Sequence, residues 1–238
     1  LSQLYHKNKR GVKAGYAMFE TFPIWNLPLK HPVNLAYEAA TADLNDVNMI
    51  DPFHLEAYGK TTVNYNRDVE IYPVLSAIFE GIFGECPYKS PTDMGVNMAG
   101  LCIFDDDACR EASCQEIIRR YYQALEKVVK DDSCQNEAYK IELIMKQAKI
   151  SPKDRVVVPA AVNLAKETDA PAAALELPDG KIVLGKTKEL LGSSAYSAKS
   201  VEPETVCALS DICYLFCGAV ECGYSQVGTD YRERQGGK

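Results

Sequence analysis

The stretch AAALELPDGKIVL, residues 172–184, decides the fold class of this chain. Apolar residues on both sides of Pro178-Asp179-Gly180 predict two strands, Ala173–Leu177 and Ile182–Leu184, joined by a tight turn. A short helix over Lys188–Leu191 is expected to follow. Because helical patterns precede this hairpin, we predict a mixed α/β chain that ends in a small α+β unit.

The region upstream of the hairpin is predicted to be helical. A long helix over Asp105–Lys130 has aspartates near its start and lysines near its end, as the helix dipole favours. A second helix is expected over Asn136–Ala148, and a third over Pro159–Glu167 after a short turn. A boundary between the helical region and the α+β unit is expected near Ile150.

The first hundred residues alternate between helical and extended patterns. The expected elements are, in order, the end of a helix over Leu1–Arg10, a strand over Gly15–Phe22, a proline-rich loop over Ile24–His31, a helix from Pro32 to Asn45, a strand over Val47–Ile50, a polar stretch over Asp51–Asn66 and an apolar helix that ends at Gly84. Pro73 leaves two alternatives for the last helix, a start near Ile71 or a kink.

Composition limits the classes of function. The formal charge of -7 and the pI near 5.1 argue against binding to nucleic acid, because phosphate neutralisation needs a basic surface. No apolar run approaches the roughly 20 residues of a membrane span, and no secretory signal is recognisable, so we expect a cytoplasmic protein without a membrane partner. Nine cysteines, an odd number, favour reduced thiols.

Two polar clusters are the candidate ligand site. The first, Tyr58–Asp68, stands directly before an apolar helix, and the second is Tyr88–Asn97. Cationic side chains and free N–H groups at a helix start both favour phosphate or carboxylate. The predicted ligand residues are Lys60, Thr61, Asn64, Asn66 and Arg67, with Lys89, Ser90, Thr92 and Asn97 opposite. The alternative is that these residues only cap helices and build turns.

Catalytic and metal chemistry have weaker support in the sequence. His54 and Asp93 are the candidates for an acid or base. We predict no metal site, because the three histidines are far apart and the cysteine spacings fit no standard zinc motif. Gly180–Thr187 matches the phosphate-loop pattern literally, but its apolar β-branched residues predict a strand instead. No cofactor can be assigned.

The strings FETFPIWNLP, residues 19–28, and AAALELPDG, residues 172–180, closely resemble the bacterial domain of unknown function 1846 family, also called uncharacterised protein family 0371. The resemblance covers Leu1 to about Ala195 and implies a longer protein, with an α/β domain, a helical insertion and a small α/β unit similar in topology to cytidine deaminases. The deaminase zinc motif is missing after Thr187. The resemblance brings no catalytic or ligand residues with it.

We therefore expect a fragment in four parts, which lacks the N-terminal part and the true C-terminus of such proteins. They are a partial α/β domain over 1–100, a helical region over 101–150, the α+β hairpin unit over 151–195, and a divergent, poorly packed tail over 196–238, for which a frameshift is one explanation.

Two functional hypotheses remain, and the sequence does not decide whether the protein is an enzyme. One is a bacterial cytoplasmic enzyme that binds an anionic small molecule, phosphorylated or nucleotide-like, between the α/β domain and the helical insertion. The other is a non-catalytic assembly or regulatory protein, a homo-oligomer whose polar loops are subunit contacts. Under the first, the two polar clusters should converge in one concave pocket.

Overall fold

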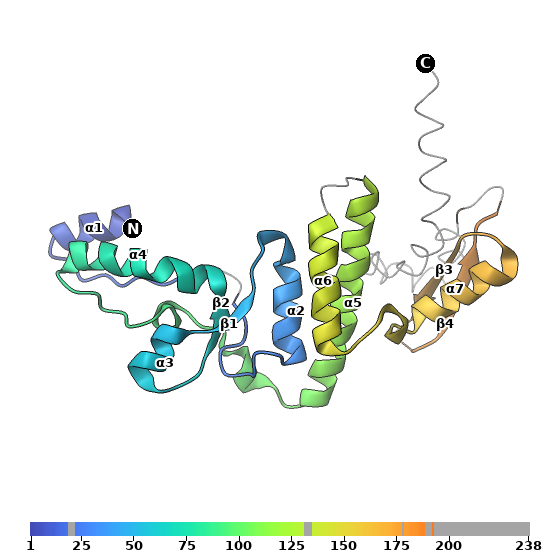
Figure 1. Ribbon diagram of the computed structural model, residues 1–238, viewed down its shortest axis with the longest axis horizontal. Coiled ribbons are helices and arrows are strands. Elements are labelled where there is room, and N and C mark those ends of the chain that lie inside the picture. The colour runs from blue at the N-terminus through green and yellow to red at the C-terminus, as the bar shows by residue number, and fades with distance from the viewer. Residues whose placement is uncertain (19–21, 131–134, 178, 189–191, 193–238) are drawn as a thin grey trace, which may run out of the picture. The chain divides into compact units, whose positions relative to one another are not determined.

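A computed structural model describes residues 1–18, 22–130, 135–177, 179–188 and 192. The chain divides into two compact units, Leu1–Cys114 and Gln115–Lys238, and the division falls inside a long helix. The described residues are mainly helical and contain two small antiparallel sheets, so the mixed α/β class predicted from the sequence is confirmed (Figure 1). The four-part division proposed above stays a prediction.

The first unit contains most of the short elements. Along the chain they are α1 (Ser2–Lys9), α2 (Pro32–Ala40), the 3-10 turn η1 (Ala42–Leu44), β1 (Asn48–Ile50), α3 (Pro52–Tyr58), β2 (Val63–Tyr65), α4 (Asn66–Phe83), the 3-10 turns η2 (Pro91–Met94) and η3 (Met98–Cys102), and the start of α5 (Asp106–Lys130). The second unit contains the rest of α5, then α6 (Gln135–Ala148), η5 (Pro152–Asp154), α7 (Val157–Thr168), β3 (Ala172–Glu176) and β4 (Ile182–Lys186).

Helices α1 and α4 build the apolar core of the first unit, and they lie side by side in Figure 1. Leu4 packs there with Tyr72, Leu75, Phe79 and Met94. Phe79 is fully buried, which places the centre of this core on α4. Since Met94 belongs to η2, the core also fixes the segment that follows α4.

Strands β1 and β2 precede and follow α3 in the sequence and pair with each other antiparallel, with Asn48 opposite Tyr65 and Ile50 opposite Val63. Tyr65 is fully buried, and its hydroxyl donates to the carbonyl of Tyr37 in α2. This pairing holds both ends of the segment that carries α3.

The proline-rich loop before α2 is ordered by one buried amide side chain. Asn34 accepts a hydrogen bond from the N–H of Ile24 at 2.7 Å and donates to the carbonyl of Ile24 at 3.1 Å. The backbone carbonyl of Asn34 accepts a hydrogen bond from the side-chain amide of Asn48 in β1. A single residue of α2 therefore ties this loop to the first sheet.

The second unit is built on the hairpin that the sequence predicts. Strands β3 and β4 pair from Ala172 opposite Lys186 to Glu176 opposite Ile182, and α7 packs on both strands. The N–H of Gly180 donates to the carbonyl of Leu177 in the turn. Because β4 occupies most of the literal phosphate-loop match, that segment has the extended structure that argued against a phosphate loop.

Several predicted elements differ from the structure. Residues 15–18 form no strand, because no neighbouring strand pairs with them among the described residues. The stretch 51–66, predicted only as polar, contains α3 and β2. Helix α4 begins at Asn66 and includes Pro73, so a start near Ile71 is wrong.

Other predictions fall outside the described residues or need only small changes. Helix α2 ends at Ala40, earlier than predicted, and η1 continues to Leu44. Lys188 is not helical, and the rest of the helix predicted there lies outside the described residues, as does the tail over 196–238. In the described part of the chain, no helix has both the length and the apolar character required to cross a bilayer.

Candidate functional site

The two predicted polar clusters meet where η2 packs against α3. The hydroxyl of Tyr58 donates to Asp93 Oδ2 over 2.9 Å. Thr62 Oγ1 lies 3.1 Å from Thr92 Oγ1, and both side chains are buried. Part of each cluster is therefore brought into one place, which we call the α3–η2 site and define by His54, Tyr58, Lys60, Lys89, Ser90 and Asp93.

The buried carboxylate of Asp51 joins α3 to η2. Its Oδ1 caps α3 by accepting the N–H of His54 at 3.0 Å. Its Oδ2 accepts the hydroxyl of Thr92 at 2.5 Å and the N–H of Thr92 at 3.2 Å. Charge-assisted bonds of this kind are stronger than neutral ones. Asp51, which is fully buried, therefore holds in register the two elements that carry His54 and Asp93.

His54 is the residue of this site whose chemistry is best defined. Its Nδ1 lies 3.0 Å from Ser90 Oγ and 3.9 Å from Asp93 Oδ1. The negative charge of Asp93 favours a proton on Nδ1, which leaves the lone pair of a neutral imidazole on Nε2. Nε2 has no hydrogen-bond partner among the described residues. His54 can therefore present a base at Nε2 while Nδ1 is held by the protein.

This arrangement is not a serine nucleophile with its histidine base. In such a triad the serine and the carboxylate contact opposite nitrogens of the imidazole. Here Ser90 and Asp93 both approach Nδ1, and Ser90 is fully buried as the cap of η2, accepting the N–H of Asp93. Ser90 and Asp93 therefore orient His54 rather than act through it.

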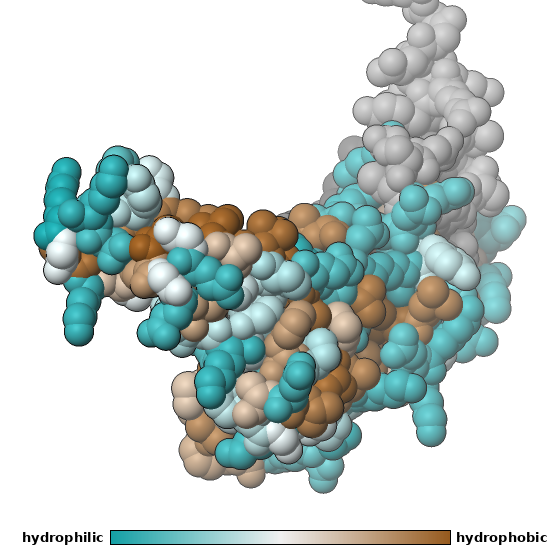
Figure 2. Space-filling model, turned by 60° about the vertical axis from the view of Figure 1, so that its left-hand side comes forward, coloured by the Kyte–Doolittle hydropathy of each residue, from teal (hydrophilic) through white to brown (hydrophobic). Residues whose placement is uncertain are grey.

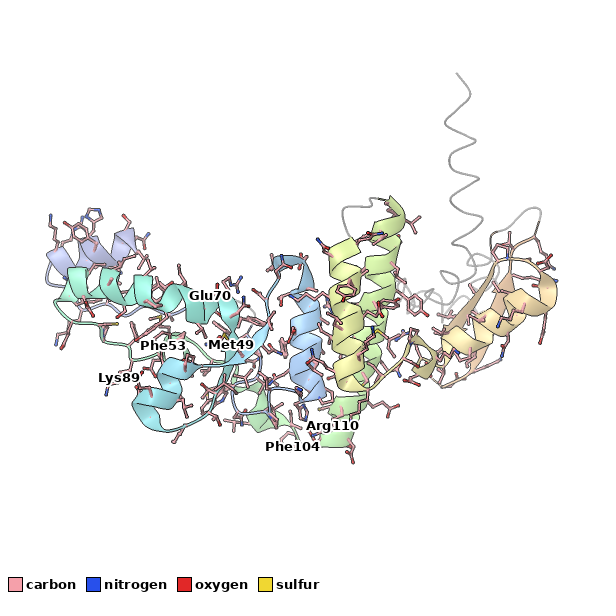
Figure 3. The ribbon with its side chains drawn as sticks, in the orientation of Figure 1. Met49, Phe53, Glu70, Lys89, Phe104 and Arg110 are labelled. Atoms are coloured by element: carbon pink, nitrogen blue, oxygen red, sulfur yellow. The ribbon has the colours of Figure 1, made fainter. Side chains whose placement is uncertain are left out.

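Two lysines and a tyrosine of the two clusters are exposed at the surface. Lys89 Nζ lies 5.8 Å from the ring centre of Tyr58, a cation–π distance, and Lys60 is exposed beyond the end of α3. Figure 3 labels Lys89 beside α3. The hydrogen bond to Asp93 is the main reason that the pKa of Tyr58 is raised. Asp93 also accepts the N–H of Lys89 at 2.8 Å, so its charge is turned toward the protein.

Three other predicted ligand residues make hydrogen bonds to backbone groups of the protein. Asn64 Oδ1 accepts the N–H of Tyr65, and Asn66 Oδ1 accepts the N–H of Val47. Asn97 accepts the N–H of Ala99 and donates to the carbonyl of Phe22. These bonds agree with the structural alternative that the sequence left open, and a ligand role for the three residues stays a prediction.

The remaining predicted residues are Thr61, Thr92 and Arg67, and they differ in exposure and in their partners. Thr61 is exposed, between Lys60 and the buried Thr62, whereas Thr92 is held by Asp51. Arg67 pairs at 3.6 Å with Asp46 and with Asp68, and it lines an open groove of about 860 Å³ with Asn66. We therefore do not assign Arg67 to the α3–η2 site.

Sequence reasoning missed the role of Asp51, although a sign of it was present. Asp followed by Pro52 is a common helix start, with the carboxylate as cap and proline at the first helical position. No sequence pattern shows that the second oxygen of that carboxylate binds Thr92. In the described residues, no group of three or more His, Cys, Asp or Glu side chains is placed to hold a metal ion.

Comparison with known proteins gives matches along most of the chain. Two family descriptions match, "Domain of unknown function DUF1846, N-terminal" over residues 1–149 and "Domain of unknown function DUF1846, C-terminal" over residues 153–199.

Similar curated proteins include members from the genera Streptococcus and Corynebacterium. A UPF0371 protein of Streptococcus thermophilus is 57% identical over 226 residues, which covers 89% of this chain and 46% of that protein. UPF0371 proteins of Corynebacterium urealyticum and Streptococcus sanguinis are 60% and 62% identical over 195 residues, covering 82% of this chain and 39% and 40% of theirs. The chain spans less than half the length of these relatives.

Proposed function

The chain belongs to the DUF1846 family, and we propose that it is a bacterial cytoplasmic enzyme that binds a small phosphorylated or nucleotide-like ligand at the α3–η2 site. His54 Nε2 is the base of the proposed reaction. The observation that carries the proposal is the geometry of His54, whose Nδ1 is held by Ser90 at 3.0 Å with Asp93 at 3.9 Å. His54 and Ser90, which are 36 residues apart in the sequence, are thereby brought into contact.

Two exposed lysines support the choice of an anionic ligand. Lys60 and Lys89 are exposed on the two clusters that meet at the α3–η2 site, and both can place an ammonium group on a phosphate. The nearby carboxylate of Asp93 opposes this, but it already accepts the Tyr58 hydroxyl and the Lys89 N–H. The Tyr58 ring adds an apolar face of the kind on which a nucleobase or another flat group stacks.

The proposed chemistry is removal of a proton from the bound ligand. A neutral imidazole with its Nδ1 proton held by the protein accepts a proton at Nε2. The resulting imidazolium is stabilised by Asp93, since its Oδ1 lies 3.9 Å from Nδ1. Asp51 keeps this geometry without contacting the ligand, because it is fully buried.

A thermal-shift screen of the chain tests the proposal. Nucleoside mono-, di- and triphosphates and sugar phosphates are each added over a range of concentrations. A ligand present at about 100 times its dissociation constant stabilises the folded state by about 2.7 kcal/mol. A ligand that binds is expected to raise the Tm by several degrees. Lys60→Ala with Lys89→Ala should remove most of that rise, because the ligand loses both cations.

The matched control replaces two exposed lysines of the same unit that lie outside the site, Lys13→Ala with Lys30→Ala. It changes the net charge by the same amount and should keep the full shift. The proposal is contradicted if no phosphorylated compound raises the Tm, or if both double variants reduce the shift equally.

A further inference from the structure

Helix α3 places Tyr58 on the same face as His54. The two residues are four apart in the sequence, and side chains with this spacing are neighbours on a helix. Their ring centres lie 4.6 Å apart, and the ring planes are tilted by 45°. Aromatic rings attract each other in tilted arrangements of this kind. The ring of Tyr58 therefore lies beside the imidazole of the proposed base.

The hydroxyl of Tyr58 holds the carboxylate that faces this imidazole. It donates to Asp93 Oδ2 over 2.9 Å, and the N–H of Lys89 donates to the same oxygen over 2.8 Å. Hydrogen bonds to an ionised acceptor are stronger than those between neutral groups. Because two donors fix Oδ2, the carboxylate cannot rotate freely, and its other oxygen, Oδ1, is kept 3.9 Å from His54 Nδ1.

Tyr58 is not a residue of the apolar core. It is 45% exposed, and the surface of the first unit carries both hydrophilic and apolar side chains (Figure 2). A side chain exposed to this extent contributes less by burial than a core residue does. Its specific contacts are instead those with Asp93, through the hydroxyl, and with His54, through the ring. Tyr58 therefore touches both members of the pair that the proposed chemistry uses.

We propose that Tyr58 is a positioning residue of the α3–η2 site, which sets the nitrogen of His54 that carries the proton by holding Asp93 in one orientation. A carboxylate oxygen kept beside Nδ1 favours the proton there and leaves the lone pair on Nε2. A carboxylate that rotates more freely gives up part of this preference. The inference rests on the proposed role of His54 as the base, but its test needs no ligand.

The test measures the imidazole nitrogens by NMR in the full chain and in Tyr58→Phe, without ligand. Phenylalanine keeps a ring beside His54 and removes only the hydroxyl that holds Asp93. The inference predicts that the ratio of the Nδ1–H to the Nε2–H tautomer of His54 falls at least about twofold, as the loss of one hydrogen bond allows. The nitrogens of His31, which is buried with its Nε2 3.0 Å from Asp106, should not change, which shows that the variant is folded.

Helix α1 supplies a matched control. The ring centre of Tyr5 lies 5.4 Å from that of His6, and Lys9 Nζ lies 5.1 Å from the Tyr5 ring, so a histidine and a lysine flank this tyrosine as well. The Tyr5 hydroxyl makes no hydrogen bond to any carboxylate in the part of the chain that the structure describes. Tyr5→Phe should therefore leave the tautomer ratio of His6 unchanged.

A second background tests whether Tyr58 acts through Asp93. Asp93→Asn removes the charge that faces Nδ1, so adding Tyr58→Phe should change the His54 ratio little further, because effects that pass through one shared partner are not additive. A failed phosphate screen would contradict the proposed function and leave this result standing. The inference is overturned if Tyr58→Phe keeps the wild-type ratio at His54, if Tyr5→Phe changes His6 as much, or if Tyr58→Phe acts equally with and without Asp93→Asn.

Discussion

Replacing Asp51 by alanine is expected to lower the free energy of unfolding by about 3 kcal/mol or more. The carboxylate is fully buried and accepts three hydrogen bonds, from the N–H of His54 and from the N–H and hydroxyl of Thr92. Alanine removes a helix cap and leaves these buried donors without their acceptor. Each such loss costs about 1–3 kcal/mol, so this small change outweighs most surface substitutions.

Urea unfolding of the full chain measures this effect, and hydrogen exchange shows where it acts. We expect the amides of Thr92 and Asp93 to exchange faster in Asp51→Ala, because α3 no longer holds η2. Asp43→Ala, an exposed aspartate at the start of η1, is the matched control and should change stability by about 0.5 kcal/mol or less. A loss for Asp51→Ala no larger than that of the control would show that Asp51 is not the link between the two elements.

Stability is expected to fall steeply with pH above the ordinary titration range of tyrosine. Burial, with added repulsion from Asp46 and Glu38, raises the pKa of Tyr65 from 10.0 to about 12. The folded protein therefore keeps a proton that the unfolded chain loses first. The stabilisation is complete below pH 10 and is lost as pH rises toward 12, by about 2 to 3 kcal/mol in total.

The variant Tyr65→Phe separates this effect from general alkaline unfolding. Phenylalanine does not titrate, so its unfolding free energy should decline less between pH 10 and pH 12. At neutral pH it should be less stable by about 1 kcal/mol, because the hydrogen bond to the carbonyl of Tyr37 is lost. Tyr139→Phe, at an exposed tyrosine of α6, is the control. Parallel pH curves for the wild type and Tyr65→Phe would contradict the buried, protonated state of Tyr65.

Elements with long patterns were predictable from the sequence. Helix α5 was found because its apolar period extends over several turns and its end charges agree with the dipole. The hairpin of β3 and β4 was found because turn residues separate two apolar runs. In each case the local preferences and the tertiary structure agree.

Elements that depend on distant contacts were not predictable. Helix α3 has only seven residues, too few for a clear apolar period, and its cap at Asp51 and left-handed Gly59 were the only local signs. The segment 15–18 has the composition of a strand, but a strand is defined by its partner, and none of the described residues provides one.

In the candidate site, too, the sequence identified single residues but not the contacts between distant segments. The sequence identified His54 and Asp93 separately as polar candidates. The distance of 3.9 Å between His54 Nδ1 and Asp93 Oδ1 depends on how η2 packs against α3. Composition also cannot distinguish a side chain that faces a ligand from one that braces a turn. Asn64, for example, was predicted to hold the ligand, and its amide oxygen accepts the N–H of Tyr65.

The most direct test of the proposed site is the NMR measurement of the two imidazole nitrogens of His54 in selectively labelled protein. The account predicts that the neutral imidazole carries its proton on Nδ1. It also predicts a change at Nε2 when a phosphorylated ligand from the thermal-shift screen binds. The assignment of His54 as the base would be contradicted by a proton on Nε2, or by nitrogen shifts that do not respond to that ligand.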